Sequence, residues 1–431
     1  MSSSSSASLS GASARSRVAR RLLPFLFLLY VANYLDRTNI AYAALGMKSD
    51  LGLSDSVFGT ASGIFFVGYF ALQIPAALLV ERWSARWLLS LTLICWGILT
   101  TLTCFVHSPL QLYGARFLLG AAEAGFFPGV IVYLSHWFIT EDRAKATAWF
   151  MSAIPIGFIV GGPIAGSILP VDWLGMAGWR WLFLLEGTPA IILGTIAMFV
   201  LPDRPGEAPW LSQHERDWLT TRIADERRAK AHAERLTVWQ ALRHPAVLVL
   251  TTGLFFTYTA GYAFYFWFPT MLQRLTGWTD VHRIAWIGTI PFVAGLIGML
   301  LIGWSSDRTH ERRWHFAVPQ LTAAAALLAW FVLPKSNALL VVVFTLLGFG
   351  TVAYLPSFWA LPSELLTSSA AAAAIGFINC TASIGGLVGP KIIGELSQRT
   401  GSFNSGFIFM IGCWIIACFF VLLCPREPAT S

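Results

Sequence analysis

Residues 116–128 read RFLLGAAEAGFFP, and residues 344–356, which lie 228 positions later, read FTLLGFGTVAYLP. Both stretches contain the triplet Leu-Leu-Gly, and in both a proline lies eight positions after the glycine. Two further pairs have nearly the same spacing: Glu81-Arg82 with Asp307-Arg308, at 226 positions, and Gly162-Pro163 with Gly389-Pro390, at 227 positions. Three ordered matches at a near-constant spacing indicate that the chain contains a duplicated unit.

The composition excludes a soluble globular protein. Of the 431 residues, 56% are hydrophobic and only 12% are charged, whereas soluble proteins average about 25% charged residues. A membrane-crossing helix needs about 20 apolar residues, and twelve such segments can be recognised, six before and six after a charged central stretch. The predicted spans are residues 22–44, 57–80, 87–106, 109–138, 144–169, 180–201, 246–272, 284–304, 315–334, 338–362, 371–395 and 402–424. We therefore predict an all-α integral membrane protein.

The charged stretches divide the chain into five parts. We predict a disordered cytoplasmic tail over 1–21, a six-helix unit over 22–201, a cytoplasmic linker over 202–245, a second six-helix unit over 246–424 and a cytoplasmic tail over 425–431. The first segment is rich in serine, lacks acids and contains four arginines, so an organelle targeting segment is the alternative interpretation. An even number of spans places both termini on one side. Twenty Lys and Arg residues lie on that side and six on the other, which predicts that both termini are cytoplasmic.

A loop between two predicted spans carries a family signature. Residues 303–313 read GWSSDRTHERR, which resembles the G-x-x-x-D-R-x-G-R-R loop of the major facilitator superfamily, and residues 77–87 are its first-half copy. Within that superfamily, the strings NYLDRTN at 33–39, GWRWLFLLEG at 178–187 and the opening stretch at 116–128 resemble the anion:cation symporter family. The resemblance implies two pseudo-repeated six-helix bundles with a substrate site between them. It also implies carriage of organic anions such as sugar acids, tartrate or phthalate.

Four ionisable residues fall inside the predicted spans of the first half: Asp36, Arg37, Arg116 and Glu123. An ionised side chain at that depth costs at least about 2.5–3.5 kcal/mol, so such a residue is a functional candidate by default. Arg116 and Glu123 share one helix face but lie roughly 10 Å apart along the axis, which is too far for easy contact. The equivalent positions of the second half carry no charge, so we expect the charged site in the first half only.

The chemistry of these four residues indicates an anion site with a coupling ion. An arginine stays charged and binds a carboxylate through two parallel hydrogen bonds. A carboxylate in a low-dielectric cavity can take up a proton near neutral pH. The family resemblance implies the same division, with Arg37 and Arg116 binding the substrate carboxylate and Asp36 and Glu123 serving cation coupling.

Further residues are candidates by position. Tyr34 shares a helix face with Arg37 by i, i+3 spacing, and polar or aromatic residues in other spans complete the proposed substrate site. These are Tyr69, Tyr262, Ser357, Trp359 and Asn379. Charged residues at the predicted cytoplasmic loop edges are candidates for a gate that latches one conformation. These are Glu81, Arg82, Arg86, Arg143, Asp307 and Arg308.

Other functional classes lack their sequence signals. No P-loop, dinucleotide fingerprint, HExxH motif or nucleophile elbow occurs, and the six cysteines form neither a CxxC pair nor a metal-ligand set. We therefore expect neither an enzyme nor an ATP-driven pump, with no cofactor and no metal. The net charge of +7 reflects the cytoplasmic basic residues and does not predict nucleic-acid binding.

The sequence thus predicts a monomeric secondary active transporter of the bacterial inner membrane, which imports a small organic anion together with protons by alternating access. An anion exchanger or efflux carrier is the nearest alternative, and a transporter-like membrane sensor is the alternative from another class. The residues do not choose among the anions, and sodium stays open as the coupling ion.

Overall fold

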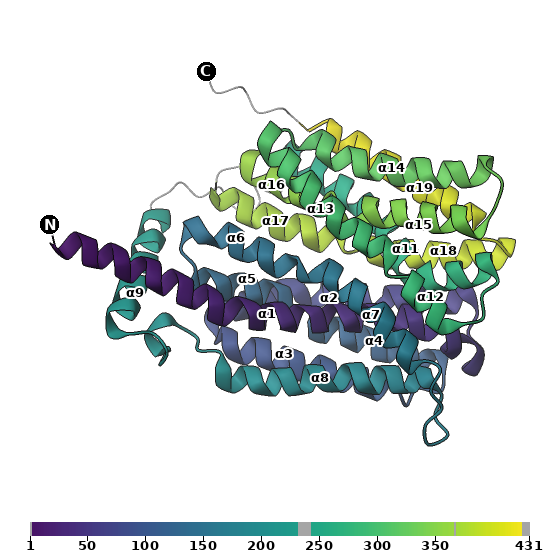
Figure 1. Cartoon of the computed structure of the whole chain (residues 1–431), viewed down its shortest axis with the longest axis horizontal. Helices are drawn as coiled ribbons and strands as arrows, with labels where there is room; N and C mark the ends of the chain where they lie inside the picture. The colour runs from purple at the N-terminus through teal and green to yellow at the C-terminus, as the bar shows by residue number, and fades with distance from the viewer. Residues whose placement is uncertain (1, 232–242, 366–367, 425–431) are drawn as a thin grey trace.

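The computed structural model describes residues 2–231, 243–365 and 368–424, and its regular secondary structure within these ranges is helical (Figure 1). The first half contains eight helices in the described residues. They are α1 (Ser2–Asp50), α2 (Asp55–Arg82), α3 (Ala85–Thr103), α4 (Pro109–Glu123), α5 (Phe126–Trp137), α6 (Thr140–Met151), α7 (Ala153–Ile168) and α8 (Gly178–Val200). A 3₁₀ turn, η1 (Pro205–Glu207), and α9 (Gln213–Ala231) follow.

The second half repeats this pattern. Its helices are α11 (Pro245–Thr276), α12 (Val281–Ile287), α13 (Ile290–Thr309), α14 (Arg313–Val332), α15 (Asn337–Val352), α16 (Leu355–Leu365), α17 (Ser368–Ala382), α18 (Gly385–Thr400) and α19 (Asn404–Leu422). Eleven helical segments of the described chain are long and apolar enough to cross a membrane. The predicted span 371–395 corresponds to α17 and α18, and some of its side chains lie outside the described residues. The all-helical architecture agrees with the prediction, while the domain boundaries stay predictions.

The duplicated proline explains why two spans are divided into helix pairs. Pro128 lacks the N–H that would bond the carbonyl of Ala124, and α4 ends just before that residue. Pro356 similarly lacks the N–H that would bond the carbonyl of Val352, where α15 ends. The repeated stretch therefore produces the same interruption in both halves.

The duplicated glycine has one packing role in both halves. A Cβ on Gly120 would lie 1.9 Å from the carbonyl oxygen of Phe65 in α2, and a Cβ on Gly348 would lie 2.2 Å from that of Pro291 in α13. Only a glycine permits backbones to approach this closely. The repeated stretches 116–128 and 344–356 thus each contain the glycine at which one helix packs on another, α4 on α2 and α15 on α13.

The N-terminal segment differs from its prediction. Residues 2–21, expected to be a disordered tail, continue α1 without a break. Contacts with other helices explain this: Arg15 Nε donates to Asp142 Oδ2 of α6 at 2.6 Å, and Ser13 Oγ donates to Glu215 of α9 at 2.7 Å. The serine-rich composition gave no sign of these partners, because both lie more than 100 residues away.

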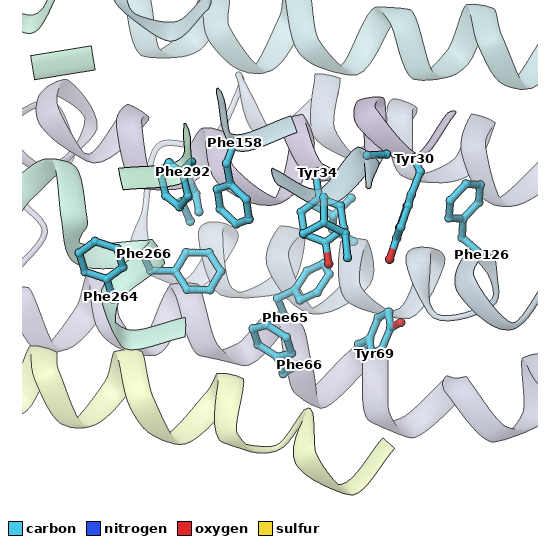
Figure 2. Packing of buried hydrophobic residues seen from close by; sticks show 14 of the residues in the cluster. Tyr30, Tyr34, Phe65, Phe66, Tyr69, Phe126, Phe158, Phe264, Phe266 and Phe292 are labelled. Atoms are coloured by element: carbon cyan, nitrogen blue, oxygen red, sulfur yellow. The ribbon is translucent and has the colours of Figure 1, made fainter. Parts of the chain in front are cut away.

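The two halves meet where α1 contacts α11, where α2 contacts α17 and α18, and where α7 contacts α12 and α13. Buried aromatic residues from both halves form one continuous core along these contacts (Figure 2). The contact between α2 and α18 is close, because a Cβ on Gly59 would lie 2.5 Å from the carbonyl oxygen of Pro390. The candidate site lies among these interface helices.

Candidate functional site

A cavity lies between the two halves and encloses about 790 Å³ of space between atoms, part of it open to solvent. Seven of the ten tyrosines of the chain line it, so tyrosine hydroxyls and rings dominate its wall. Six of the predicted substrate residues are among the lining residues: Tyr34, Arg37, Tyr69, Tyr262, Trp359 and Asn379. A cavity between duplicated halves is where the repeat architecture places a substrate.

Aromatic pairs form the wall and connect the halves. The rings of Phe66 in α2 and Tyr262 in α11 lie 4.5 Å apart, and those of Phe158 in α7 and Tyr265 in α11 lie 4.6 Å apart. Figure 2 shows Phe66 and Phe158 beside Tyr34 and Tyr69 in this core. Any change in the angle between the halves must therefore rearrange these ring contacts.

The wall contains a repeat that the sequence analysis missed. Tyr30 and Tyr34 of α1 have counterparts 228 positions later in Tyr258 and Tyr262 of α11, and all four line the cavity. At the same spacing Arg37 corresponds to Tyr265, which also lines the cavity. Extending the repeat search to the first and seventh spans would have identified Tyr258.

Glu123 and Arg37 form a buried ion pair. Arg37 Nε donates to Glu123 Oε2 at 2.9 Å, and Asn33 Nδ2 donates to the same oxygen at 2.8 Å. Glu123 is fully buried at the end of α4, whereas the Arg37 side chain is 12% exposed and reaches the cavity. The Arg37 guanidinium also lies 5.0 Å from the ring centre of Tyr69. Glu123 therefore pairs with a neighbouring helix and not with Arg116 of its own helix.

Arg116 is fully buried, and in the described structure none of its three guanidinium nitrogens has a hydrogen-bond partner. It lies in a smaller pocket that adjoins the tyrosine-lined cavity and also contains Arg37 and Tyr34. Its guanidinium lies 4.9 Å from the ring centre of Phe65. A buried charge without hydrogen bonds is costly, so a carboxylate that reached this pocket would gain strongly from its five N–H donors.

Asp36 points away from both pockets. Its carboxylate accepts hydrogen bonds from Asn39 Nδ2 at 2.7 Å and from Thr100 Oγ1 of α3 at 2.6 Å, and the residue is 1% exposed. Arg37, the next residue of α1, bonds Glu123 instead, so the two neighbouring side chains have different partners. Asp36 is therefore placed behind the cavity wall.

The remaining substrate candidates divide into two groups. Asn379 Oδ1 accepts a hydrogen bond from Tyr258 at 3.3 Å, and Trp359 lines the cavity with an indole N–H that has no partner among the described atoms. Ser357 is fully buried beside the cavity and is not one of its lining residues. The geometry thus groups Asn379 and Trp359 with the tyrosines and sets Ser357 apart.

The predicted gate residues bond within their own half or to the stretch that follows the first half. Arg86 contacts Asp203 at 3.8 Å, Arg143 contacts Glu226 at 3.9 Å, and Arg312 contacts Asp307 at 2.6 Å. Arg308 lies 5.6 Å from the ring centre of Trp304. The side chains of Glu81 and Arg82 lie outside the described residues. Among the described residues, these four gate residues therefore show no ion pair or ring contact with the other half.

An ion pair does connect the halves at the opposite end, away from the start of α1 (Figure 1). Arg274 of α11 donates to both carboxylate oxygens of Asp55 in α2, at 2.6 and 2.7 Å. Ser397 of α18 donates to Asp55 at 2.6 Å, and Lys48 of α1 pairs with the same carboxylate. We call these four residues the Asp55 cluster. Lys48 and Arg274 are two of the six basic residues that were counted on the side opposite the termini, and they were not selected as gate residues.

Glu186 is a buried acid that the sequence analysis did not select, although it lies in the predicted span 180–201. It sits in α8, is 8% exposed, and its Oε2 has no hydrogen-bond partner in the described part of the chain. The rule that selected the four first-half charges would have selected Glu186 as well.

Two duplicated helical halves around an interface cavity define a membrane transporter. The chain belongs to the major facilitator superfamily, whose sequence profile matches residues 26–390. It is accordingly a multi-pass integral membrane transporter and not an enzyme, as the sequence predicted.

Relatives and solved structures agree with this assignment. A protein of Agrobacterium vitis named "Putative tartrate transporter" is 39% identical over 95% of this chain and 94% of its own. A Pseudomonas putida protein named "Putative metabolite transport protein NicT" is 37% identical over 96% and 94%. The fold resembles that of a bacterial homologue of the human lysosomal transporter Spinster in an inward-facing, occupied conformation, with a TM-score of 0.76, 20% identity, and coverage of 94% of this chain and 96% of that one.

Proposed function

We propose that this protein is a proton-coupled symporter that imports a small organic anion across the bacterial inner membrane by alternating access. The observation that carries the proposal is Arg116, a buried guanidinium with unused donors beside the Arg37–Glu123 ion pair. The names of the bacterial relatives, one a tartrate transporter and one a metabolite transporter, support a small anion as substrate. The excess of Lys and Arg on the side of the termini supports cytoplasmic ends.

The ion pair supplies a coupling mechanism. In its ionised form Glu123 is the anionic partner of Arg37, in the ion pair at 2.9 Å. When Glu123 takes up a proton it loses its charge, and Arg37 becomes available to a substrate carboxylate. The substrate then replaces Glu123 as the anionic partner of Arg37, while Arg116 supplies a second guanidinium from the adjoining pocket.

Charge balance favours joint movement of anion and proton. With all four groups ionised, Asp36 and Glu123 balance Arg37 and Arg116. An added anion and protons of equal total charge leave that balance unchanged, whereas either alone leaves a net buried charge in a low-dielectric site, which is costly. The protein should therefore favour the two transport states in which both sites are filled or both are empty.

Uptake into proteoliposomes tests this proposal. Purified protein is reconstituted and an inward proton gradient is imposed, with tartrate, a sugar acid, phthalate and inorganic phosphate as separate labelled solutes. We expect at least one organic anion to accumulate with the proton gradient and to remain at equilibrium without it. Accumulation with a sodium gradient alone would overturn proton coupling, and no accumulation with either gradient would overturn the symporter. Efflux against a gradient would favour the exporter.

The Asp55 cluster supports alternating access, in which residues 22–201 and 246–424 would move as two bodies. It ties α2, α11 and α18 together at one end. In our proposal the cluster closes the external side, so the described conformation faces the cytoplasm.

Asp55→Asn should open the external side more often. The substitution removes the charge that Arg274 and Lys48 share, and we expect the open-to-closed ratio to rise by about tenfold, which corresponds to about 1.4 kcal/mol. Ser49 and Thr400 carry one spin label each in a Cys95→Ala background. Double electron–electron resonance then measures the distance between the two labels. Arg283→Gln, at an exposed arginine that packs on Trp278 of its own half, is the control. Identical distance distributions in Asp55→Asn and the unsubstituted protein would contradict the latch.

A further inference from the structure

A second buried polar cluster lies behind α1, on the side away from the tyrosine-lined cavity. It consists of Asp36 and Asn39 on α1, Thr100 on α3 and Glu186 on α8, and we call it the Asn39 cluster. Asp36 and Asn39 are each 1% exposed and Glu186 is 8% exposed. None of the four lines either pocket. The cluster therefore has no direct contact with a substrate.

Asn39 lies between the two carboxyl groups. Its amide donates to Asp36 at 2.7 Å, and its side chain also neighbours Glu186. Asp36 has a second donor in Thr100 at 2.6 Å. In the described structure, Oε2 of Glu186 and Oδ1 of Asn39 have no partner. The hydrogen-bond donors Asn39 and Thr100 thus both bond to Asp36, and Glu186 has fewer hydrogen bonds than Asp36.

The hydrogen-bond donors and the charges around Asp36 and Glu186 indicate which of these two acids holds a proton. An ionised carboxylate can only accept hydrogen bonds, whereas a protonated one can also donate. Two ionised acids so close together in a buried site repel each other. The charged groups that face Asp36 are Arg116 and Glu123 of α4, while Glu186 faces Asp36 and the hydroxyl of Tyr42. Glu186 has no basic residue among these neighbours, so the neutral form fits its surroundings.

Tyr42 links this cluster to the interface between the halves. Its hydroxyl is buried, lacks a hydrogen-bond partner among the described residues, and lies 2.9 Å from the position of a Cβ on Gly162 in α7. It also lies 2.8 Å from the position of a Cβ on Gly288, between α12 and α13. A change of charge on Glu186 would thus act next to a helix contact that must shift when the halves move.

We propose that Glu186 is a second proton-carrying residue of this transporter, next to Asn39 and Asp36 and separate from the substrate pocket. The inference rests on the proposed symport. In each cycle the O–H bond of Glu186 breaks, and the proton is released to the cytoplasmic side. Glu186 is protonated again from the external side. More than one proton then moves with each anion.

The test measures the proton-to-anion ratio. Proteoliposomes with the membrane potential clamped at zero receive a series of imposed pH differences, and the equilibrium accumulation of tartrate, or of the panel anion that accumulates, is measured. Each coupled proton contributes a factor of ten in accumulation per pH unit. We expect Glu186→Gln to lower this slope by one factor of ten per pH unit and to leave counterflow exchange measurable.

Controls distinguish this inference from the proposed function. Glu186→Asp retains a titratable carboxyl and should keep the slope of the unsubstituted protein, which separates proton carriage from packing and serves if Glu186→Gln does not fold. Glu207→Gln, at an exposed acid on η1, is the matched control. No pH-dependent accumulation in the unsubstituted protein would overturn the symport itself. A normal slope in Glu186→Gln, or a lowered slope in Glu186→Asp, would overturn only the role of Glu186.

Discussion

Replacing Arg116 with lysine is expected to weaken anion binding by about ten- to a hundredfold, and replacing it with glutamine should abolish measurable binding. Lysine keeps the charge but lacks the planar fork that holds a carboxylate through two hydrogen bonds. The expected loss corresponds to about 1.4–2.8 kcal/mol. Glutamine removes the charge, and removing one partner of a buried pair costs about 3–5 kcal/mol. Concentration dependence of counterflow in proteoliposomes measures the effect.

The matched control is Arg399→Lys, which makes the same substitution at an exposed arginine on α18. It should leave the counterflow affinity unchanged, because surface ion pairs contribute about 1 kcal/mol or less. A folded Arg116→Lys protein with unchanged affinity would show that Arg116 does not touch the substrate. Its unsatisfied donors would then have to be explained by the interior of the first half alone.

The fold could be predicted because membrane helices are decided by local sequence. Twenty apolar residues and the spacing of 228 positions suffice to place the spans and to identify the duplication. The prolines at 128 and 356 even mark where two spans are interrupted. The N-terminal helix could not be predicted in this way, because its order depends on Asp142 and Glu215, two distant partners.

In the candidate site, too, some features could be predicted from the sequence and others depended on distant partners. The rule that charges inside the membrane are functional candidates selected Arg116 and Glu123, and the structure places one of them in a pocket and the other in a buried ion pair. The rule says nothing of partners, so the pairing of Glu123 with Arg37 required three-dimensional information. The prediction of the gate residues was likewise made without three-dimensional information. The residues chosen as a gate were loop charges on the same side of the membrane as the termini. The ion pair that the structure shows between the halves is instead formed by Asp55 and Arg274.

Glu123→Gln should abolish accumulation driven by a proton gradient while exchange remains measurable. The amide keeps the shape of the side chain and can still accept the hydrogen bonds from Asn33 and Arg37, but it cannot ionise, so it lacks the charge that holds Arg37 against a substrate carboxylate. In the unsubstituted protein, anion affinity should fall as the pH rises, because ionised Glu123 then occupies Arg37. In the variant this dependence should disappear, since Arg37 is available at every pH.

Two measurements on the same proteoliposomes check this prediction. Uptake of the panel anion under an inward proton gradient should fall to the level without a gradient, and counterflow affinity should be constant across the pH range. Glu207→Gln, far from the cavity on η1, should retain both properties of the unsubstituted protein. Accumulation in Glu123→Gln with its normal dependence on pH would remove Glu123 from coupling. The acids of the Asn39 cluster would then have to carry all of the coupled protons, and the ion pair with Arg37 would be structural.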